Sequence, residues 1–157
     1  MPTDSRLDAR TRHGIPLFNA DDEAERGIPS PVAELKEVIV AANGLILATP
    51  EYNNSLPGVF KNAIDWLSRP PSDIKRVLGG KPVAIIGASA GGFGTVLSQA
   101  AWLPVMRTLG VALWTEGRLL VPRAGAAFDQ DGTLIDAAVT QQLRTFVAGF
   151  VAWIAKR

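Results

Sequence analysis

The stretch that decides the fold is Ala48-Thr49-Pro50-Glu51-Tyr52-Asn53-Asn54-Ser55-Leu56-Pro57-Gly58-Val59-Phe60-Lys61-Asn62-Ala63-Ile64-Asp65-Trp66. The residues that lead into it, 44–49, are apolar without alternation, which predicts a strand covered on both faces. Beyond the polar loop, apolar residues return at helical spacing, and Pro70-Pro71 ends the pattern. The order of buried strand, polar loop and helix is the place where an α/β protein binds a ligand.

The polar loop offers several kinds of group to a ligand. Pro50 stiffens the exit from the strand, Glu51 and Asn53 can hydrogen-bond, and Tyr52 presents a flat ring with a polar tip. A planar ring rich in heteroatoms needs such groups. The alternative reading, a plain turn that ends in a helix cap, is open at this point because these residue types also form turns.

Length and composition predict one globular domain over residues 1–157. The chain is 47% hydrophobic and 20% charged, which is enough apolar material for a core. Its formal net charge is +1, and its basic residues are scattered. We therefore expect a small-molecule partner, with no nucleic-acid or membrane surface.

The absence of cysteine excludes disulfides, thiolate catalysis and cysteine metal sites. His13 is the only histidine, so a metal site with several histidines is impossible, and we expect His13 to be a surface side chain and no metal to bind. No apolar run is long enough to span a membrane, and the first dozen residues have no signal-peptide core. A cytoplasmic protein is the expectation.

Further elements alternate along the chain. Ser30 is expected to cap a helix that has Pro31 at its first position and ends at Asn43-Gly44. The remaining expected elements are a strand over 82–87, a glycine-rich loop over 88–94, a helix over 95–108 kinked at Pro104, strand pieces over 111–114 and 119–121, a turn over 129–132, a capping box over 133–136, and a final helix with Ile135, Val139, Leu143, Phe146, Val147, Phe150 and Ile154 on its buried face.

The alternation of strands and helices predicts right-handed crossovers and a parallel sheet. Parallel strands end at the same edge, so the Pro50 loop and the Ser89 loop should face one crevice. Glycines in the second loop, among them Gly91 and Gly92, would let backbone amides approach a ring or a phosphate. A tight strand-to-helix turn is the equally simple alternative for this loop taken alone.

The glycine-rich loop also imitates two other motifs. Gly87-Ala88-Ser89-Ala90-Gly91 has the G-x-S-x-G spacing of a serine hydrolase elbow, but that fold needs a histidine after the serine, and His13 precedes it. Gly87 and Gly92 have the spacing of a nucleotide P-loop, but Phe93-Gly94 stands where the lysine and hydroxyl residue belong. Neither alternative is supported.

The run 48–66 closely resembles the signature of the NADPH-dependent FMN reductases, a flavodoxin-like family that includes chromate, quinone and azo reductases. The similarity starts near Gly14-Ile15-Pro16-Leu17-Phe18-Asn19 and continues through the C-terminal helix. It implies a three-layer sandwich with a parallel sheet, and hydride transfer from NAD(P)H through FMN to a quinone, azo compound, metal oxyanion or free flavin. It also implies a homodimer or homotetramer. No side chain need act as an acid or base, because the cofactor carries the chemistry. The flavin-binding residues implied by the resemblance are Pro50, Glu51, Tyr52, Asn53, Ser55, Ser89, Gly91, Gly92 and Phe93.

One departure from the family pattern lies at the start of the chain. The family begins with a strand, a serine- and arginine-containing phosphate loop and a helix, and none of these is recognisable before Thr11. The expectation is therefore a shortened domain that lacks the first strand-loop-helix unit. A noncatalytic binding or assembly subunit that has lost FMN is the second reading.

Overall fold

A parallel sheet forms the middle layer of the computed structural model, which describes residues 5–11 and 14–157. Strand β1 (Leu45–Ala48) pairs with β2 (Pro82–Ala88) along its whole length, from Leu45 opposite Val83 to Ala48 opposite Ile86. On the other side of β2, its start pairs with β3 (Ala112–Leu113) and its end with β4 (Leu119–Val121). β2 is therefore the central strand, and the expected parallel sheet is confirmed.

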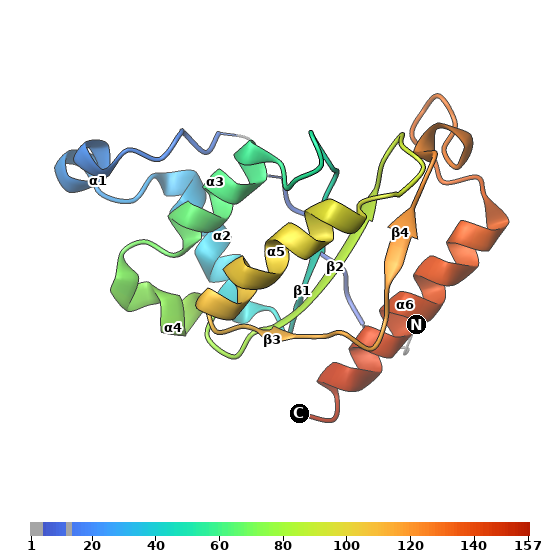
Figure 1. Cartoon of the computed structure of the whole chain (residues 1–157). Helices are drawn as coiled ribbons and strands as arrows, with labels where there is room; N and C mark the ends of the chain where they lie inside the picture. Colours follow the sequence, from blue (N-terminus) through green and yellow to red (C-terminus); the bar gives the residue numbers. More distant parts are fainter. Residues whose placement is uncertain (1–4, 12–13) are drawn as a thin grey trace.

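Helices cover both faces of this sheet (Figure 1). On one face lie α2 (Ser30–Ala41), α3 (Gly58–Leu67), the short α4 (Ile74–Val77) and α5 (Val96–Thr108), and on the other lies α6 (Ala137–Ile154). The smaller elements are α1 (Ala20–Arg26) and the 3-10 turns η1 (Pro71–Asp73) and η2 (Ala124–Ala126). The three-layer α/β architecture expected from the sequence is confirmed.

The two faces of β2 anchor two separate apolar clusters, because side chains alternate along a strand. Val83 and Ile85 belong to the cluster under α2, α3 and α5, whose largest fully buried members include Trp66 and Trp102. Ala84 belongs to the cluster under α6. The buried residues of that second cluster are Ala84, Trp114, Leu119, Val121, Ala127, Phe146 and Phe150.

Helix α3 follows the pattern read from the sequence. Ala63, Ile64 and Leu67 are buried, and the Phe60 ring packs edge-on against Trp102 with the ring centroids 5.0 Å apart. The helix ends at Leu67, ahead of the two prolines. Its apolar stripe therefore packs towards the sheet, as expected.

The predicted cap at Ser30 is wrong. Ser30 is already the first helical residue of α2, and Pro29 is the N-cap without a side-chain hydrogen bond. The Pro29 carbonyl accepts the first helical hydrogen bonds, from the amides of Val32 (2.9 Å) and Ala33 (3.0 Å). The helix therefore begins one residue earlier than the sequence indicated. Proline has no amide hydrogen to donate, so Pro31 fits the first turn of the helix in either register.

The predicted capping box over 133–136 is also wrong. Asp136 is the N-cap of α6, and its Oδ1 accepts hydrogen bonds from the amides of Ala138 (2.8 Å) and Val139 (3.0 Å). Thr133 instead belongs to a tight turn, because its amide donates to Asp129 Oδ1 at 2.8 Å. Ile135 consequently lies ahead of the helix, 60% exposed, and not on its buried face. The turn predicted over 129–132 is confirmed by the bond from the Gly132 amide to the Asp129 carbonyl (3.1 Å).

The helices α1 and α5 compare differently with what the sequence predicted. α1 was not anticipated, although Asn19 accepts a cap bond from the Asp21 amide and acidic residues fill the first turn, which is the usual helix-start signal. α5 continues past Pro104 to Thr108, and the kink at that residue stays a prediction. His13 lies outside the described residues.

The outer edge of β1 has no partner strand among residues 5–11 and 14–157. Its two central side chains nevertheless pack into the core, since Leu47 is buried in one cluster and Ile46 packs against the other. β1 thus has the apolar faces of an interior strand. In the same part of the chain, no helix is both long and apolar enough to cross a bilayer.

A buried cation fastens α2 to the turn at η1. The Lys36 side chain is almost fully buried, and its ammonium donates to the Arg69 carbonyl and to Asp73 Oδ2 at 2.9 Å. The hydrogen bonds from Lys36 and then Arg76 lower the pKa of Asp73 below its ordinary value of 3.8. A lowered pKa means that this contribution to stability is present above the ordinary value and is lost as the pH falls through the folded-state value.

We predict that Lys36→Met lowers the free energy of unfolding by about 1–3 kcal/mol at neutral pH, since the Arg69 carbonyl and Asp73 lose a buried donor. Denaturant unfolding measures this. The control is Lys75, an exposed lysine in α4. Lys75→Met should change the free energy of unfolding by less than about 0.5 kcal/mol. The deficit of Lys36→Met should begin to shrink as the pH falls below 3.8 and should reach its minimum once the pH has passed through the lowered folded-state pKa of Asp73. A deficit independent of pH would contradict the assignment to Asp73.

Candidate functional site

Two loops leave the sheet side by side at its carboxyl edge. Residues 49–57 follow β1 and residues 89–95 follow β2, and the two strands pair in parallel up to Ala48 and Ile86. The pairing extends one residue further through the Thr49 amide, which donates to the Ile86 carbonyl at 2.9 Å. The structure therefore brings together the two segments that contain all nine residues expected at the site.

The first loop is a tight hairpin that projects from the sheet edge. Tyr52 and Ser55 exchange backbone hydrogen bonds of 3.2 and 3.0 Å. Asn53 and Asn54 between them both adopt left-handed backbone angles, with φ of 50° and 59°. Two consecutive left-handed residues are what a two-residue hairpin turn requires, and asparagine tolerates them. The turn leaves the Tyr52 ring 59% exposed.

The second loop is fastened at its start to β4 and the segment beyond it. The Ser89 amide donates to the Val121 carbonyl (3.0 Å), and the Ser89 carbonyl accepts from the Ala124 amide (2.9 Å). The Gly91 carbonyl accepts from the Arg123 amide at 3.0 Å. The Ser89 hydroxyl donates across the loop to the Gly94 carbonyl. The loop thus has a fixed shape before any ligand is considered.

This loop leaves several backbone amides without an acceptor among the described residues. Within the described part of the chain, no acceptor faces the amides of Ala90, Gly91, Gly92 and Phe93 in a hydrogen bond. All four residues are exposed, and a side chain at Gly91 or Gly92 would meet nothing nearer than 3.9 Å. Exposed backbone donors with open space in front of them are suited to a ligand rich in acceptors.

Glu51 joins the first loop to the helix behind the second. Its Oε2 accepts hydrogen bonds from the amides of Leu97 (2.8 Å) and Ser98 (2.9 Å), in the first turn of α5. The sequence placed Glu51 among the ligand-binding groups, and the structure shows that this oxygen already has two partners within the chain.

A buried polar cluster under the loops was missed by sequence reasoning. Thr49 Oγ1 lies 3.0 Å from Ser98 Oγ, donates to the Pro50 carbonyl (2.9 Å) and accepts from Trp102 Nε1 (3.2 Å). Thr49, Ser98 and Trp102 are all buried. The only sequence signal for this cluster is a threonine that ends an otherwise apolar strand, and its partners come from a helix far along the chain.

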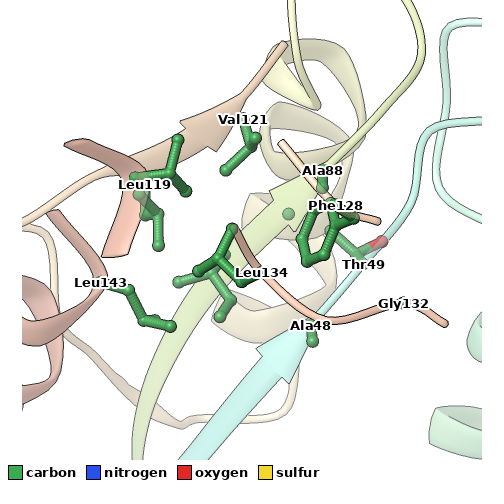
Figure 2. Close-up of a pocket in the computed structure, with 12 residues that line it drawn as sticks. Ala48, Thr49, Ala88, Leu119, Val121, Phe128, Gly132, Leu134 and Leu143 are labelled. Carbon is green, nitrogen blue, oxygen red and sulfur yellow. The ribbon is translucent and has the colours of Figure 1, made fainter. Parts of the chain in front are cut away.

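An apolar cavity of about 300 Å³ opens on the α6 side of the same strand ends (Figure 2). Figure 2 shows the Phe128 ring beside Thr49 and Ala88, and the turn at Gly132 near Ala48. Its lining residues are Ala48, Thr49, Ile86, Gly87, Ala88, Leu119, Val121, Phe128, Gly132, Leu134, Val139 and Leu143. None of the nine expected site residues lines this cavity, so the sequence expectation concerns the loops above it.

In the described part of the chain, no group of three or more His, Asp or Glu side chains is arranged so that it could hold a metal ion. The groups at the carboxyl edge are instead backbone amides, the exposed rings of Tyr52 and Phe93, and hydroxyl or amide side chains. Such a set can bind and orient a planar ring.

Comparison with known proteins identifies relatives over nearly the whole chain. The model of the NADPH-dependent FMN reductase family matches residues 6–126. A 2-hydroxy-1,4-benzoquinone reductase from a Burkholderia species is 35% identical over 99% of this chain and 83% of its own length. An NAD(P)H-dependent FMN reductase from Pseudomonas aeruginosa is 38% identical, over 99% of this chain and 82% of its own length. Among solved structures, the flavoenzyme NAD(P)H:(acceptor) oxidoreductase FerB from Paracoccus denitrificans superposes with a TM-score of 0.79 at 34% identity, covering 92% of this chain and 78% of FerB.

We predict that Ser89→Ala leaves ester hydrolysis at the background rate of the parent protein. The Ser89 hydroxyl is engaged by the Gly94 carbonyl, and the sequence holds no histidine after it to act as a base. Turnover of p-nitrophenyl acetate measures this, and a serine-directed phosphonate serves as a second probe. Stoichiometric labelling of Ser89 by the phosphonate would contradict the prediction.

Proposed function

Because the chain belongs to the NADPH-dependent FMN reductase family, we propose that it is an NAD(P)H-dependent oxidoreductase whose FMN ring rests on the two loops at the carboxyl edge. The observation that supports this most directly is the row of amides over 90–93, which have no hydrogen-bond acceptor among the described residues. The pyrimidine edge of a flavin carries carbonyl oxygens and ring nitrogens that accept hydrogen bonds. Donors and acceptors therefore match.

The remaining groups of the two loops fit the flat faces of the same ring. Tyr52 and Phe93 are exposed aromatic side chains on neighbouring loops, the latter 81% exposed. Aromatic faces bind a planar π-system, and their burial on binding is favourable. The residues proposed to hold the ring are Pro50, Glu51, Tyr52, Asn53, Ser55, Ser89, Gly91, Gly92 and Phe93, with Glu51 acting through its backbone and its contact with α5.

The phosphate of FMN is not proposed to sit at α5. A helix N-terminus is a common place for a phosphate, since its free amides and the helix dipole attract an anion. At α5, the amides of Leu97 and Ser98 are taken by the Glu51 carboxylate. A second anion there would meet that negative charge, so the ring end of the cofactor suits this part of the site.

When bound, FMN supplies the transfer of a hydride from NAD(P)H and of electrons to an acceptor. The residues of this chain bind and orient the ring, and the amides over 90–93 stabilise negative charge at its acceptor edge. No side chain is proposed as a general acid or base.

A quinone is the acceptor proposed first. The Burkholderia relative is named for a benzoquinone, and an Escherichia coli quinone reductase is 51% identical over 54% of this chain and 44% of its own length. An azo compound, a metal oxyanion or free flavin are the other candidates. A cytoplasmic location, a single domain over 1–157 and a homodimer or homotetramer remain proposals from the sequence.

Titration of the purified chain with FMN, followed by flavin fluorescence, is the test of this proposal. We expect quenching to saturate, and we expect NADPH or NADH to be consumed faster with 1,4-benzoquinone than with an azo dye, chromate or free flavin. Absence of FMN binding would overturn the proposal and favour a noncatalytic binding subunit. Bound FMN without NAD(P)H oxidation would also overturn it.

We predict that Gly91→Val weakens FMN binding at least about tenfold while stability changes by less than about 0.5 kcal/mol. The branched side chain would stand before the free amides, yet the space around Gly91 is open. Gly94→Val is the matched contrast. Gly94 has a φ of +62°, and an added Cβ would lie only 3.2 Å from Leu120 Cβ. This variant should therefore lower the free energy of unfolding by about 1–3 kcal/mol. Equal FMN affinity of Gly91→Val and the parent would remove Gly91 from the site.

A further inference from the structure

The N-terminus of α5 is capped by a residue from a different loop. The amides of Leu97 and Ser98 occupy the second and third helical positions, where the N-cap side chain normally accepts hydrogen bonds. In α5 the acceptor is Glu51, 46 and 47 positions earlier in the chain. The cap is therefore a tertiary contact between the two loops of the site.

The N-cap residue of α5 itself does not accept hydrogen bonds from these amides. Thr95 is the N-cap, but its side chain makes no cap hydrogen bond, and its backbone lies at φ −117° and ψ 35°, away from the extended angles of a capping residue. Its hydroxyl is buried and accepts from Gln99 Nε2 at 3.1 Å. Without Glu51, the first-turn amides would have no protein acceptor among the described residues.

The cap lies at the end of the loop that carries the free amides. The start of that loop is fastened by Ser89 to β4, and its end runs directly into α5. Glu51 fastens the same end of the loop to the hairpin that bears Tyr52. The buried contact of Thr49 with Ser98 lies beside this cap and joins the same two segments, so it limits how far they separate when the cap is lost.

The cap also places a carboxylate in the site. Among the described residues, no basic side chain forms an ion pair with Glu51. The α5 dipole compensates only part of a full negative charge. A ring on the adjacent loops would therefore be held near a residual negative charge, which opposes the gain of electrons by that ring.

We propose that Glu51 is a positioning residue that couples the two loops of the flavin site through its cap on α5, and whose charge makes the bound flavin harder to reduce. The inference rests on the proposed function for the effect on flavin. The coupling of the loops does not depend on it.

Two variants of Glu51 separate the hydrogen bonds from the charge. Glu51→Ala removes both, and Glu51→Gln keeps an acceptor oxygen for the two amides. The matched control is Glu34→Gln on α2, because Glu34 is exposed and has no hydrogen bond or ion pair with the described residues. All variants are measured in the full chain.

The flavin-free measurement is hydrogen exchange of peptides covering 89–98. Glu51→Ala should raise exchange there and lower the Tm by about 2–6 °C, while peptides of α6 are unchanged. Glu51→Gln should recover most of this loss, and Glu34→Gln should match the parent. Unchanged exchange over 89–98 in Glu51→Ala would overturn the coupling, whether or not the parent binds FMN.

The flavin measurements are FMN affinity and midpoint potential. Glu51→Ala should weaken FMN binding at least about fivefold. Glu51→Gln should bind FMN nearly as the parent does but shift the flavin potential to a more positive value, which a purely structural cap would not do. A parental potential in Glu51→Gln would overturn the role of the charge. No FMN binding by the parent would overturn the proposed function and this effect on flavin, while the exchange result still decides the coupling.

Discussion

The close approach of three backbone segments at Gly87 is the constraint on which the carboxyl edge depends. Gly87 lies in β2 between the exit of β1 and the start of α5, and a Cβ there would collide with the Thr49 carbonyl and the Thr95 side chain. Because Gly87 has no side chain, the Thr49 carbonyl and the Thr95 side chain can both approach the β2 backbone at this point. The contact of Thr49 with Ser98 and the cap from Glu51 both require this approach. A larger residue would push apart the segments that carry the two loops.

Above this meeting point, the polar groups divide into those used by the chain and those left for a ligand. The hairpin at 52–55, the bonds from Ser89 to β4 and the cap on α5 satisfy the backbone groups that fix the loops. The amides over 90–93 remain. Because the loop is held by hydrogen bonds on both sides, these donors are oriented before a ring arrives, and less ordering is required on binding. The glycines there leave open space in front of them.

The position of Glu51 changes how charge is distributed in a site of this architecture. An α/β protein often presents a free helix N-terminus at the carboxyl edge of its sheet, and that terminus attracts anions. Here a side chain of the neighbouring loop occupies it. The donors left facing outward are the neutral loop amides, which suit the polar edge of a ring better than a dianion. In the proposed function, the cap therefore favours a neutral ring over an anion at this place, and it also satisfies the first-turn amides of α5.

The sequence by itself determined the fold class and the two loops that meet at the carboxyl edge of the sheet. Unbroken apolar runs at 45–48 and 82–88 specify buried parallel strands, and such strands necessarily end at one edge, so the convergence of the Pro50 and Ser89 loops was predictable. The local caps were not predictable, because Ser30 and Thr133 have capping chemistry but Pro29 and Asp136 take the N-cap positions. Thr133 is instead held in the turn that begins at Asp129. The cap of α5 by Glu51, the cluster of Thr49 with Ser98 and the free amides over 90–93 were decided only by the tertiary structure. The first two contacts join residues more than 40 positions apart. The free amides depend on which backbone groups the rest of the chain leaves without a partner. No local sequence pattern encodes these relations.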